Sequence, residues 1–380
     1  MSALEGLTVL DFSTLLPGPL AGLIMAEAGA TIVKVERPNT GDEMRSYPPR
    51  IDDDSVNFVM LNRGKHSLAI DLKAADAVAR LRPLIEKADV LIEQFRPGVM
   101  ARLGLGYEQV RAINPGIVYC SITGWGQTGP KANVASHDLN YIAETGLLGL
   151  GADAAGKPVL PPMLAADIAG GALPAVMNIM FALRQRDRTG EGAYLDISMS
   201  DNLFAFSYWG VGSGLSGQGW PKPGRELVTG GSPRYQIYAT ADGRYVAAAP
   251  IEDKFWAAFT RIVELPEAFR DPAADPAEAI AAVGQRIATR TAAQWKALFE
   301  GQDVCCSIVA TLEEAVDDPH VKARGLFAHS IGFGQTTLPA LPVPVAPVFR
   351  TLPDRKGAPT LGDSNPSLLG DDRMRPAATD

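Results

Sequence analysis

The segment LTVLDFSTLLPGPLAGLIMAEAGATIVKVERP, residues 7–38, decides the fold class. Residues 7–12 form a short apolar run typical of a strand, and residues 31–38, TIVKVERP, are predicted to form the next strand. Between them, residues 21–29 carry apolar side chains at helical spacing, and Gly29 is a helix stop signal. A strand, a helix and a second strand in this order are typical of a parallel sheet whose strands are joined by helices.

The alternation of strands and helices continues beyond this segment. Residues 90–95 and 117–123 are further strand candidates, and a helical stretch at about 74–87 separates the second strand from the third. A long helical segment at about 168–186 ends in a charged, glycine-containing turn, and AYLDISM (193–199) follows as a strand. We therefore predict an α/β fold with a doubly wound parallel sheet, Rossmann-like in architecture, in a large domain.

The composition changes after this first part. Residues 210–233 are rich in Gly, Ser and Pro and predict a linker or mobile loop. Two strands joined at Asp242-Gly243 and helices to about residue 315 then predict a smaller α+β domain. The proline-rich stretch from about residue 338 predicts an extended tail. The expected layout is a large α/β domain at 1–200, a linker at 201–233, a small domain at 234–325 and a C-terminal segment at 326–380.

Composition and charge argue against several classes of function. The 380 residues carry a formal net charge of −8, whereas nucleic-acid affinity needs a basic face. The three cysteines offer no metal-ligand spacing, so we expect no metal and a reducing compartment. The N-terminus lacks the pattern of a secretory signal, and no uncharged apolar run approaches membrane-spanning length. We expect a cytoplasmic protein without nucleic-acid or membrane partners.

The first strand-to-helix turn argues against a nicotinamide-dependent dehydrogenase. Such an enzyme carries G-x-G-x-x-G in this turn and an acidic residue at the end of the second strand. Glu36 fits the second feature, but the turn STLLPGPLAG lacks the glycine pattern. Its prolines also remove backbone N–H groups that would bind a pyrophosphate.

Nine stretches carry a resemblance to a known family. They are LDFSTLLPGPLAG, VKVERPNTGD, LNRGKHSLAIDLK, IEQFRPGV, RLGLGY, ITGWGQTGP, SHDLNY, ADIAGG and DPHVKARG. In this order they resemble the class III CoA-transferases, a family that includes the α-methylacyl-CoA racemases. The resemblance implies a large doubly wound domain, a smaller domain, and two chains interlocked as a homodimer. It also implies that the C-terminal segment returns to the large domain.

The resemblance implies an acyl-CoA thioester as substrate and no permanently bound cofactor. The phosphates of coenzyme A need cations and free N–H groups, and its adenine stacks well on a guanidinium plane. Arg37 follows a strand end, where ligands bind in open α/β sheets. The other candidates for the coenzyme A site lie in the matched stretches: Asn62, Arg63, Lys65, Arg96 and Lys131.

The catalytic candidates are His137 in SHDLNY, Asp167 in ADIAGG and Glu252 in APIEDKFW. In the racemases that the chain resembles, His137 and Asp167 match an acid/base pair, and Glu252 matches a glutamate from the partner's small domain. In the transferases, the residue matching Asp167 is a nucleophile that forms an aspartyl-CoA thioester. Racemases carry His-Asp at the position of His137-Asp138, whereas many transferases carry Tyr-Asp. We therefore expect racemisation of 2-methylacyl-CoA, with CoA transfer between carboxylic acids as the alternative and a non-catalytic CoA-binding relative as a further one.

Overall fold

The computed structural model describes residues 2–153, 155–271, 273–351 and 357–370. The chain divides into two compact units, which are described separately below. The large unit comprises Met1–Thr145, Met163–Ala205 and Lys322–Asp380, and the small unit comprises Gly146–Pro162 and Phe206–Val321.

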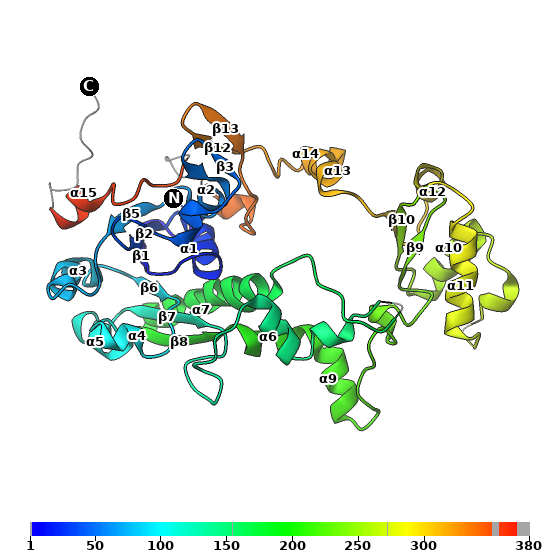
Figure 1. Ribbon diagram of the computed structural model, residues 1–380, viewed down its shortest axis with the longest axis horizontal. Helices are drawn as coiled ribbons and strands as arrows, with labels where there is room; N and C mark the ends of the chain where they lie inside the picture. Colours follow the sequence, from blue (N-terminus) through cyan, green and yellow to red (C-terminus); the bar gives the residue numbers. More distant parts are fainter. Residues whose placement is uncertain (1, 154, 272, 352–356, 371–380) are drawn as a thin grey trace. The chain divides into compact units, whose positions relative to one another are not determined.

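The large unit is built on a six-stranded sheet in the order β5-β2-β1-β6-β7-β8, with every neighbouring pair parallel (Figure 1). The strands are β1 (Thr8–Asp11), β2 (Thr31–Glu36), β5 (His66–Ala69), β6 (Val90–Glu93), β7 (Val118–Thr123) and β8 (Ala193–Ser198). From β1 the chain adds β2 and β5 on one side, then returns to add β6, β7 and β8 on the other. The strand order therefore reverses between β1 and β6, as the doubly wound prediction requires.

The sequence analysis did not predict strand β5, because it placed only a helical stretch between the second strand and the one at residue 90. The sequence of β5, HSLA, begins with polar residues, so its apolar signal is weak. The helices of this unit are α1 (Pro17–Glu27), α2 (Val56–Asn62), α3 (Ala77–Ile85), α4 (Val99–Arg102), α5 (Tyr107–Ile113), α6 (Asp138–Glu144), α7 (Leu173–Thr189) and α8 (Met199–Leu203). A π-helix, η3 (Ala166–Ala172), runs directly into α7.

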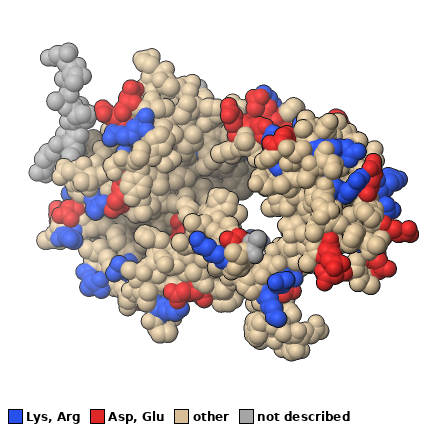
Figure 2. All heavy atoms as spheres, turned by 45° about the vertical axis from the view of Figure 1, so that its right-hand side comes forward, with Lys and Arg blue, Asp and Glu red and all other residues tan. Residues whose placement is uncertain are grey.

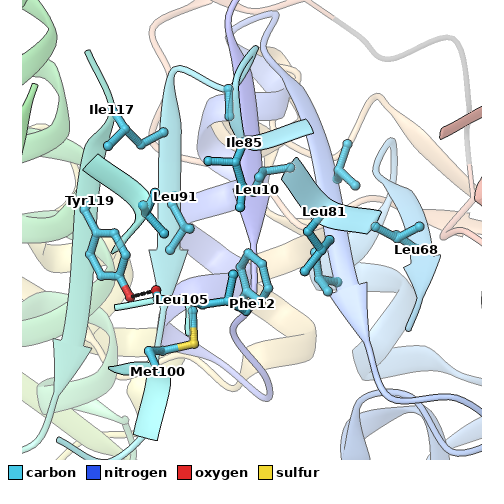
Figure 3. Packing of buried hydrophobic residues seen from close by; sticks show 14 of the residues in the cluster. Leu10, Phe12, Leu68, Leu81, Ile85, Leu91, Met100, Leu105, Ile117 and Tyr119 are labelled. Atoms are coloured by element: carbon cyan, nitrogen blue, oxygen red, sulfur yellow. Dashed lines mark hydrogen bonds between the residues drawn. The ribbon is translucent and has the colours of Figure 1, made fainter. Parts of the chain in front are cut away.

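Side chains alternate between the two faces of the sheet. Leu10, Leu91 and Tyr119 are paired across β1, β6 and β7 and pack under α3 and α5 in one apolar core (Figure 3). Helices α1 and α7 contact the strands from the other side. Strands covered on both faces are apolar along their length, which explains why they were identified from continuous apolar runs.

Helix α1 is buried along its whole length, from Pro17 to Glu27. Proline at the first helical position suits the N-terminus, because its missing N–H would have no partner there. The chain leaves the helix through Gly29, whose φ of +103° is unfavourable for other residues. An apolar helix of this kind is expected in the core of a large domain.

The helix Ala166–Thr189 is long and apolar enough, by length and composition alone, to cross a membrane. However, 50% of its most apolar window is buried inside the protein. Within the large unit α7 contacts α1, β7 and β8. These contacts are those of a helix that covers the sheet.

The C-terminal segment packs on the large unit through polar contacts. The side chain of Asn365 in α15 (Asn365–Leu369) exchanges two hydrogen bonds of 2.8 Å with the backbone of Ala69 in β5. The Arg350 Nε donates to Glu27 at 2.7 Å. This segment also holds the hairpin of β12 (Ser330–Phe333) and β13 (Thr336–Pro339). Strands β3 (Arg50–Ile51) and β4 (Asp54–Ser55) form another short hairpin.

The small unit contains a three-stranded antiparallel sheet in the order β11-β10-β9. The predicted hairpin is confirmed by β9 (Gln236–Ala239) and β10 (Tyr245–Ala248), whereas the short β11 (Cys306–Ile308) was not predicted. Its helices are α9 (Tyr208–Leu215), α10 (Asp253–Ile262), α11 (Pro276–Ile287), α12 (Ala292–Phe299) and α13 (Leu312–Asp317), and α14 (Pro319–Ala323) spans the boundary between the two units.

Helix α9 includes the first part, residues 210–215, of the stretch 210–233 for which a linker or mobile loop was predicted. The glycines there permit close packing: a Cβ on Gly214 would lie 2.3 Å from the Trp220 ring, and one on Gly210 would lie 2.7 Å from Pro221. Two glycines of this stretch thus lie where a larger residue would not fit.

Candidate active site

The first turn of α1 offers few backbone donors at the carboxyl edge of the sheet. Pro17 and Pro19 have no N–H, the Leu20 N–H donates to the Leu16 carbonyl at 2.9 Å, and the Gly18 N–H donates to Gln94 Oε1 at 2.7 Å. The turn therefore lacks the row of free amides that a dinucleotide pyrophosphate requires. This agrees with the sequence argument against a nicotinamide site.

A pocket of about 280 Å³ lies at this edge of the sheet. On one side of the strand-order reversal it is lined by the turn between β1 and α1. On the other side it is lined by the segment after β6 and by the end of β7. Ligands of open α/β sheets bind at such a position. His137 and Asp167 line the same pocket, so the structure brings the two predicted catalytic residues together.

Asp167 lies in the first turn of the π-helix that leads into α7. Its backbone N–H donates to Asp138 Oδ1 at 2.9 Å, and Asp138 itself is 5% exposed. Burial and the negative charge of Asp138 raise the pKa of Asp167 to about 6, against the opposing effect of His137. A carboxyl group with this pKa can accept and release a proton near neutral pH.

The glycines of ADIAGG explain how the π-helix fits beside α8. A Cβ on Gly170 would lie 2.5 Å from the Met199 carbonyl oxygen, and one on Gly171 would lie 3.1 Å from Met199 and from Pro17. The Asn202 side-chain amide donates to the Gly170 carbonyl at 2.8 Å. Asn202 therefore helps to hold a helix type that is rare and often found at functional sites.

His137 precedes α6 and is exposed at its N-terminus, where its backbone N–H donates to Asn140 Oδ1 at 3.0 Å. Tyr141, one turn later, donates from its hydroxyl to the Ser136 carbonyl at 2.9 Å, and its ring packs edge-on against Trp125. Burial raises the pKa of Tyr141 to about 12, so it stays protonated. These contacts fix the wall of the pocket that carries His137.

The segment after β6 forms the opposite part of the lining. Glu93 is 4% exposed, and its Oε2 accepts the Phe95 N–H at 2.8 Å, which holds the turn that leads to Arg96. Burial raises the pKa of Glu93 to about 7. Arg96 is exposed and lines the pocket with Gln94. Of the six predicted coenzyme A residues, Arg96 is the one that shares the pocket with His137 and Asp167.

Two other predicted cations are accessible but paired. The Arg37 side chain is 61% exposed and lies 2.7 Å from a Glu43 carboxylate oxygen. Lys131 forms an ion pair with Glu144, and its Nζ lies 4.7 Å from the centroid of the Trp125 ring. Figure 2 shows cationic and anionic side chains interspersed over the visible face rather than gathered into a single basic patch.

Asn62, Arg63 and Lys65 lie in the interior of the large unit, which differs from the expected contact with phosphates. The Lys65 Nζ is 3.1 Å from Asp11 Oδ2 and donates to Asn62 Oδ1 at 2.9 Å. Burial lowers the pKa of Lys65 to about 8. Arg63 donates to Glu27 at 2.8 Å and to the Leu341 carbonyl at 2.6 Å, so it joins α1 to the C-terminal segment.

Glu252 belongs to the small unit, where it is exposed and directly precedes α10. The sequence analysis did not single out Asp138, Tyr141, Gln94 or Asn202 as site residues. Asp138 and Tyr141 belong to the SHDLNY stretch, whose matched pattern was the available signal. Gln94 belongs to the matched stretch IEQFRPGV, where the sequence analysis selected only Arg96. Asn202 had no such signal, and its hydrogen bond to Gly170 joins segments far apart in the chain.

Comparisons with known proteins show the family of this chain. The sequence pattern of CoA-transferase family III matches residues 4–365. The chain is 35% identical to the α-methylacyl-CoA racemase of Mus musculus, over 96% of this chain and 92% of that protein. It is 34% identical to the succinyl-CoA:glutarate CoA-transferase of Mus musculus, over 86% of this chain and 76% of that protein.

A solved structure has the same fold. The crystal structure of a CAIB/BAIF family protein from Brucella suis is similar with a TM-score of 0.83 at 27% identity, covering 97% of this chain and 99% of that one. The match in sequence and in structure extends over nearly the whole chain. The chain therefore belongs to CoA-transferase family III.

Proposed function

We propose that this protein inverts the configuration at carbon 2 of 2-methylacyl-CoA thioesters. The observation that carries the proposal is that His137 and Asp167 line one pocket, with the pKa of Asp167 raised to about 6. An imidazole and a carboxylate with such a pKa form a suitable pair of acid and base near neutral pH. The 35% identity to an α-methylacyl-CoA racemase supports the same reaction.

In the proposed mechanism, one residue of the pair removes the proton from carbon 2. The electron pair of the broken C–H bond forms a C=C bond, and the π electron pair of the thioester carbonyl moves onto its oxygen to give an enolate. The other residue then donates a proton to the opposite face, and the thioester carbonyl forms again. Starting from the other enantiomer, the two residues exchange their roles.

Arg37, Arg96 and Lys131 remain the residues that we propose for the phosphates of coenzyme A. Arg37 directly follows β2, and Arg96 follows β6 after two residues, so both come from the carboxyl ends of parallel strands. Their cationic groups are accessible, whereas Arg63 and Lys65 are buried in ion pairs. An exposed guanidinium can release a weak surface partner such as Glu43 to bind a phosphate.

We also propose that a second copy of the chain completes the site by bringing the Glu252 of its small unit to His137. His137 is exposed in the single chain, so it is available to a partner. Helix α7 also carries an exposed apolar stripe: Leu173 is 39% exposed, Met177 is 50% exposed and Phe181 is 62% exposed, at intervals of four residues. Apolar stripes of this kind often mark protein interfaces.

CoA transfer between carboxylic acids is the second candidate function. It is favoured by the 34% identity to a succinyl-CoA:glutarate CoA-transferase and by the accessible position of Asp167 in the pocket. In that reaction the Asp167 carboxylate would attack the thioester carbonyl and displace the thiolate of coenzyme A. That thiolate would then attack the Asp167 carbonyl of the resulting mixed anhydride, which gives an aspartyl-CoA thioester and releases the donor acid as its carboxylate.

One experiment separates the two functions. The protein is incubated in D₂O with each enantiomer of a 2-methylacyl-CoA, without an acceptor acid. Racemisation places deuterium at carbon 2 from both enantiomers, and His137→Ala abolishes at least one direction of exchange. Transfer leaves the carbon 2 hydrogen in place and gives product only when a second carboxylate is added. Trapping of an aspartyl-CoA ester at Asp167 without deuteration would overturn the racemase proposal.

A further inference from the structure

The orientation of the Gln94 side chain in the pocket is determined by a backbone group. Its Oε1 lies 2.7 Å from the Gly18 nitrogen, which carries a hydrogen and can only donate. The atom that faces Gly18 must therefore be the carbonyl oxygen of the amide, not its nitrogen. Among the residues that the structure describes, none accepts a hydrogen bond from Gln94 Nε2. Gln94 lines the pocket that contains His137 and Asp167, so this donor is available there.

The contact between Gly18 and Gln94 is closely packed. A Cβ on Gly18 would lie 2.2 Å from the Ser13 side chain and 2.5 Å from Gln94 Oε1. Only glycine fits at this position without displacing its neighbours. Glycine at position 18 therefore permits the 2.7 Å hydrogen bond to Gln94 that fixes the orientation of its amide.

Gly18 also connects Gln94 to the positive end of α1. In the first turn of this helix, Pro17 and Pro19 have no N–H and the Leu20 N–H is used by Leu16. The Gly18 N–H that remains donates to Gln94. A hydrogen bond to the oxygen of an amide polarises it and makes its N–H groups better donors. Gln94 thus extends the field of the helix N-terminus into the pocket.

We propose that Gln94 contacts the substrate, with Nε2 donating a hydrogen bond to the acyl oxygen of the thioester. The inference rests on the proposed thioester substrate, but it does not depend on which reaction follows. The acyl oxygen gains negative charge when the carbon 2 proton leaves and also when a carboxylate attacks the carbonyl carbon. A fixed donor at that oxygen stabilises the charge in either case.

The test compares two probes that differ in the acyl oxygen. One is a 2-methylacyl-CoA thioester, and the other is the S-alkyl-CoA thioether of the same carbon skeleton, which has no carbonyl. Gln94→Glu keeps an oxygen for Gly18 and replaces the donor by an acceptor, whereas Gln94→Met removes the donor without adding a charge. The dissociation constants of both probes are measured calorimetrically for the unaltered protein and both variants.

We expect both variants to reduce the preference for thioester over thioether by about 2- to 10-fold, the range for one hydrogen bond. Turnover of the thioester should fall by roughly 100-fold or more, as for loss of one donor to a developing oxyanion. Gln185→Glu, at an exposed position of α7, is the matched control and should change neither quantity. Equal weakening of both probes, or an unchanged preference in both folded variants, would overturn the assignment. Because the binding comparison needs no turnover, absence of α-deuteration would refute the racemase proposal and leave this one intact.

Discussion

Replacing Asp138 by asparagine should move the pH dependence of activity toward lower pH. The Oδ1 of an asparagine can still accept the Asp167 N–H, which Asp138 accepts at 2.9 Å, so the geometry is retained while one negative charge is removed. Burial is the larger cause of the raised pKa of Asp167, and the charge of Asp138 is the second. In Asp138→Asn the pKa of Asp167 should therefore fall from about 6 but stay above its ordinary value of 3.8.

The size of the change is bounded by these values. The whole rise of the Asp167 pKa is about two units, and burial is the larger of its two causes, so loss of the Asp138 charge predicts a fall of at most roughly one unit. Because Asp167 must be ionised to act as a base, the acid limb of kcat/KM shifts to lower pH by the same amount. Above the limb the rate should decrease, since a carboxylate of lower pKa is a weaker base.

The assay is the initial rate of deuterium incorporation at carbon 2 between about pH 4.5 and 9, with the unaltered protein measured in parallel. Asp187→Asn is a suitable control, because Asp187 is an exposed carboxylate of α7 whose side chain is 60% exposed. That variant should keep the original limb. If the limb of a folded Asp138→Asn protein stays in place, the charge of Asp138 does not tune Asp167 and the reasoning fails.

Three further predictions concern the same unit. Since the folded-state pKa of Asp167 is raised, the unfolding free energy of the protein should fall as pH rises from about 4 to 6. Asp167→Asn should lose activity, but its unfolding free energy, measured by urea denaturation, should exceed that of the parent by on the order of 3 kcal/mol at pH 8 and by little at pH 4. Gly170→Ala should destabilise the protein by roughly 1–3 kcal/mol and slow turnover, because its Cβ would lie 2.5 Å from the Met199 carbonyl; a melting temperature equal to that of the parent would contradict this. Phe181→Asp should give a monomer by light scattering if the α7 stripe is an interface, whereas Asp at the equally exposed Arg184 position should leave the mass unchanged.

Much of the fold was predictable because the sheet is parallel and buried. Most of its strands are rich in apolar residues, and the helices between them carry an apolar periodicity, so β1, β2, β6, β7 and β8 could be placed from local pattern. Strand β5 was missed because its sequence, HSLA, begins with two polar residues, so its apolar signal was weak. Helix α9 was missed because its glycines were interpreted as flexibility, although they pack against Trp220 and Pro221.

The candidate site was predictable only in part. The stretches SHDLNY and ADIAGG led to His137 and Asp167, which the structure places around one pocket. The stretch LNRGK led to expected phosphate ligands that turn inward, because Lys65 is paired with Asp11 and Arg63 with Glu27. Asp11 lies 54 residues from Lys65, and Glu27 lies 36 residues from Arg63, so these pairs could not be predicted from a local pattern.

The sequence by itself determined the parallel α/β architecture, the membership in the family and the choice of His137 and Asp167 as the candidate acid/base pair, because apolar periodicity and short motifs are local properties of the chain. The tertiary structure decided which polar groups face the pocket and which are paired with one another in the interior. Burial and the charge of Asp138 raise the pKa of Asp167. The hydrogen bond from Gly18, 76 residues away, fixes the orientation of the Gln94 side-chain amide. The physical reason is that desolvation, charge interaction and hydrogen bonding depend on distances in space, which only the folded chain defines.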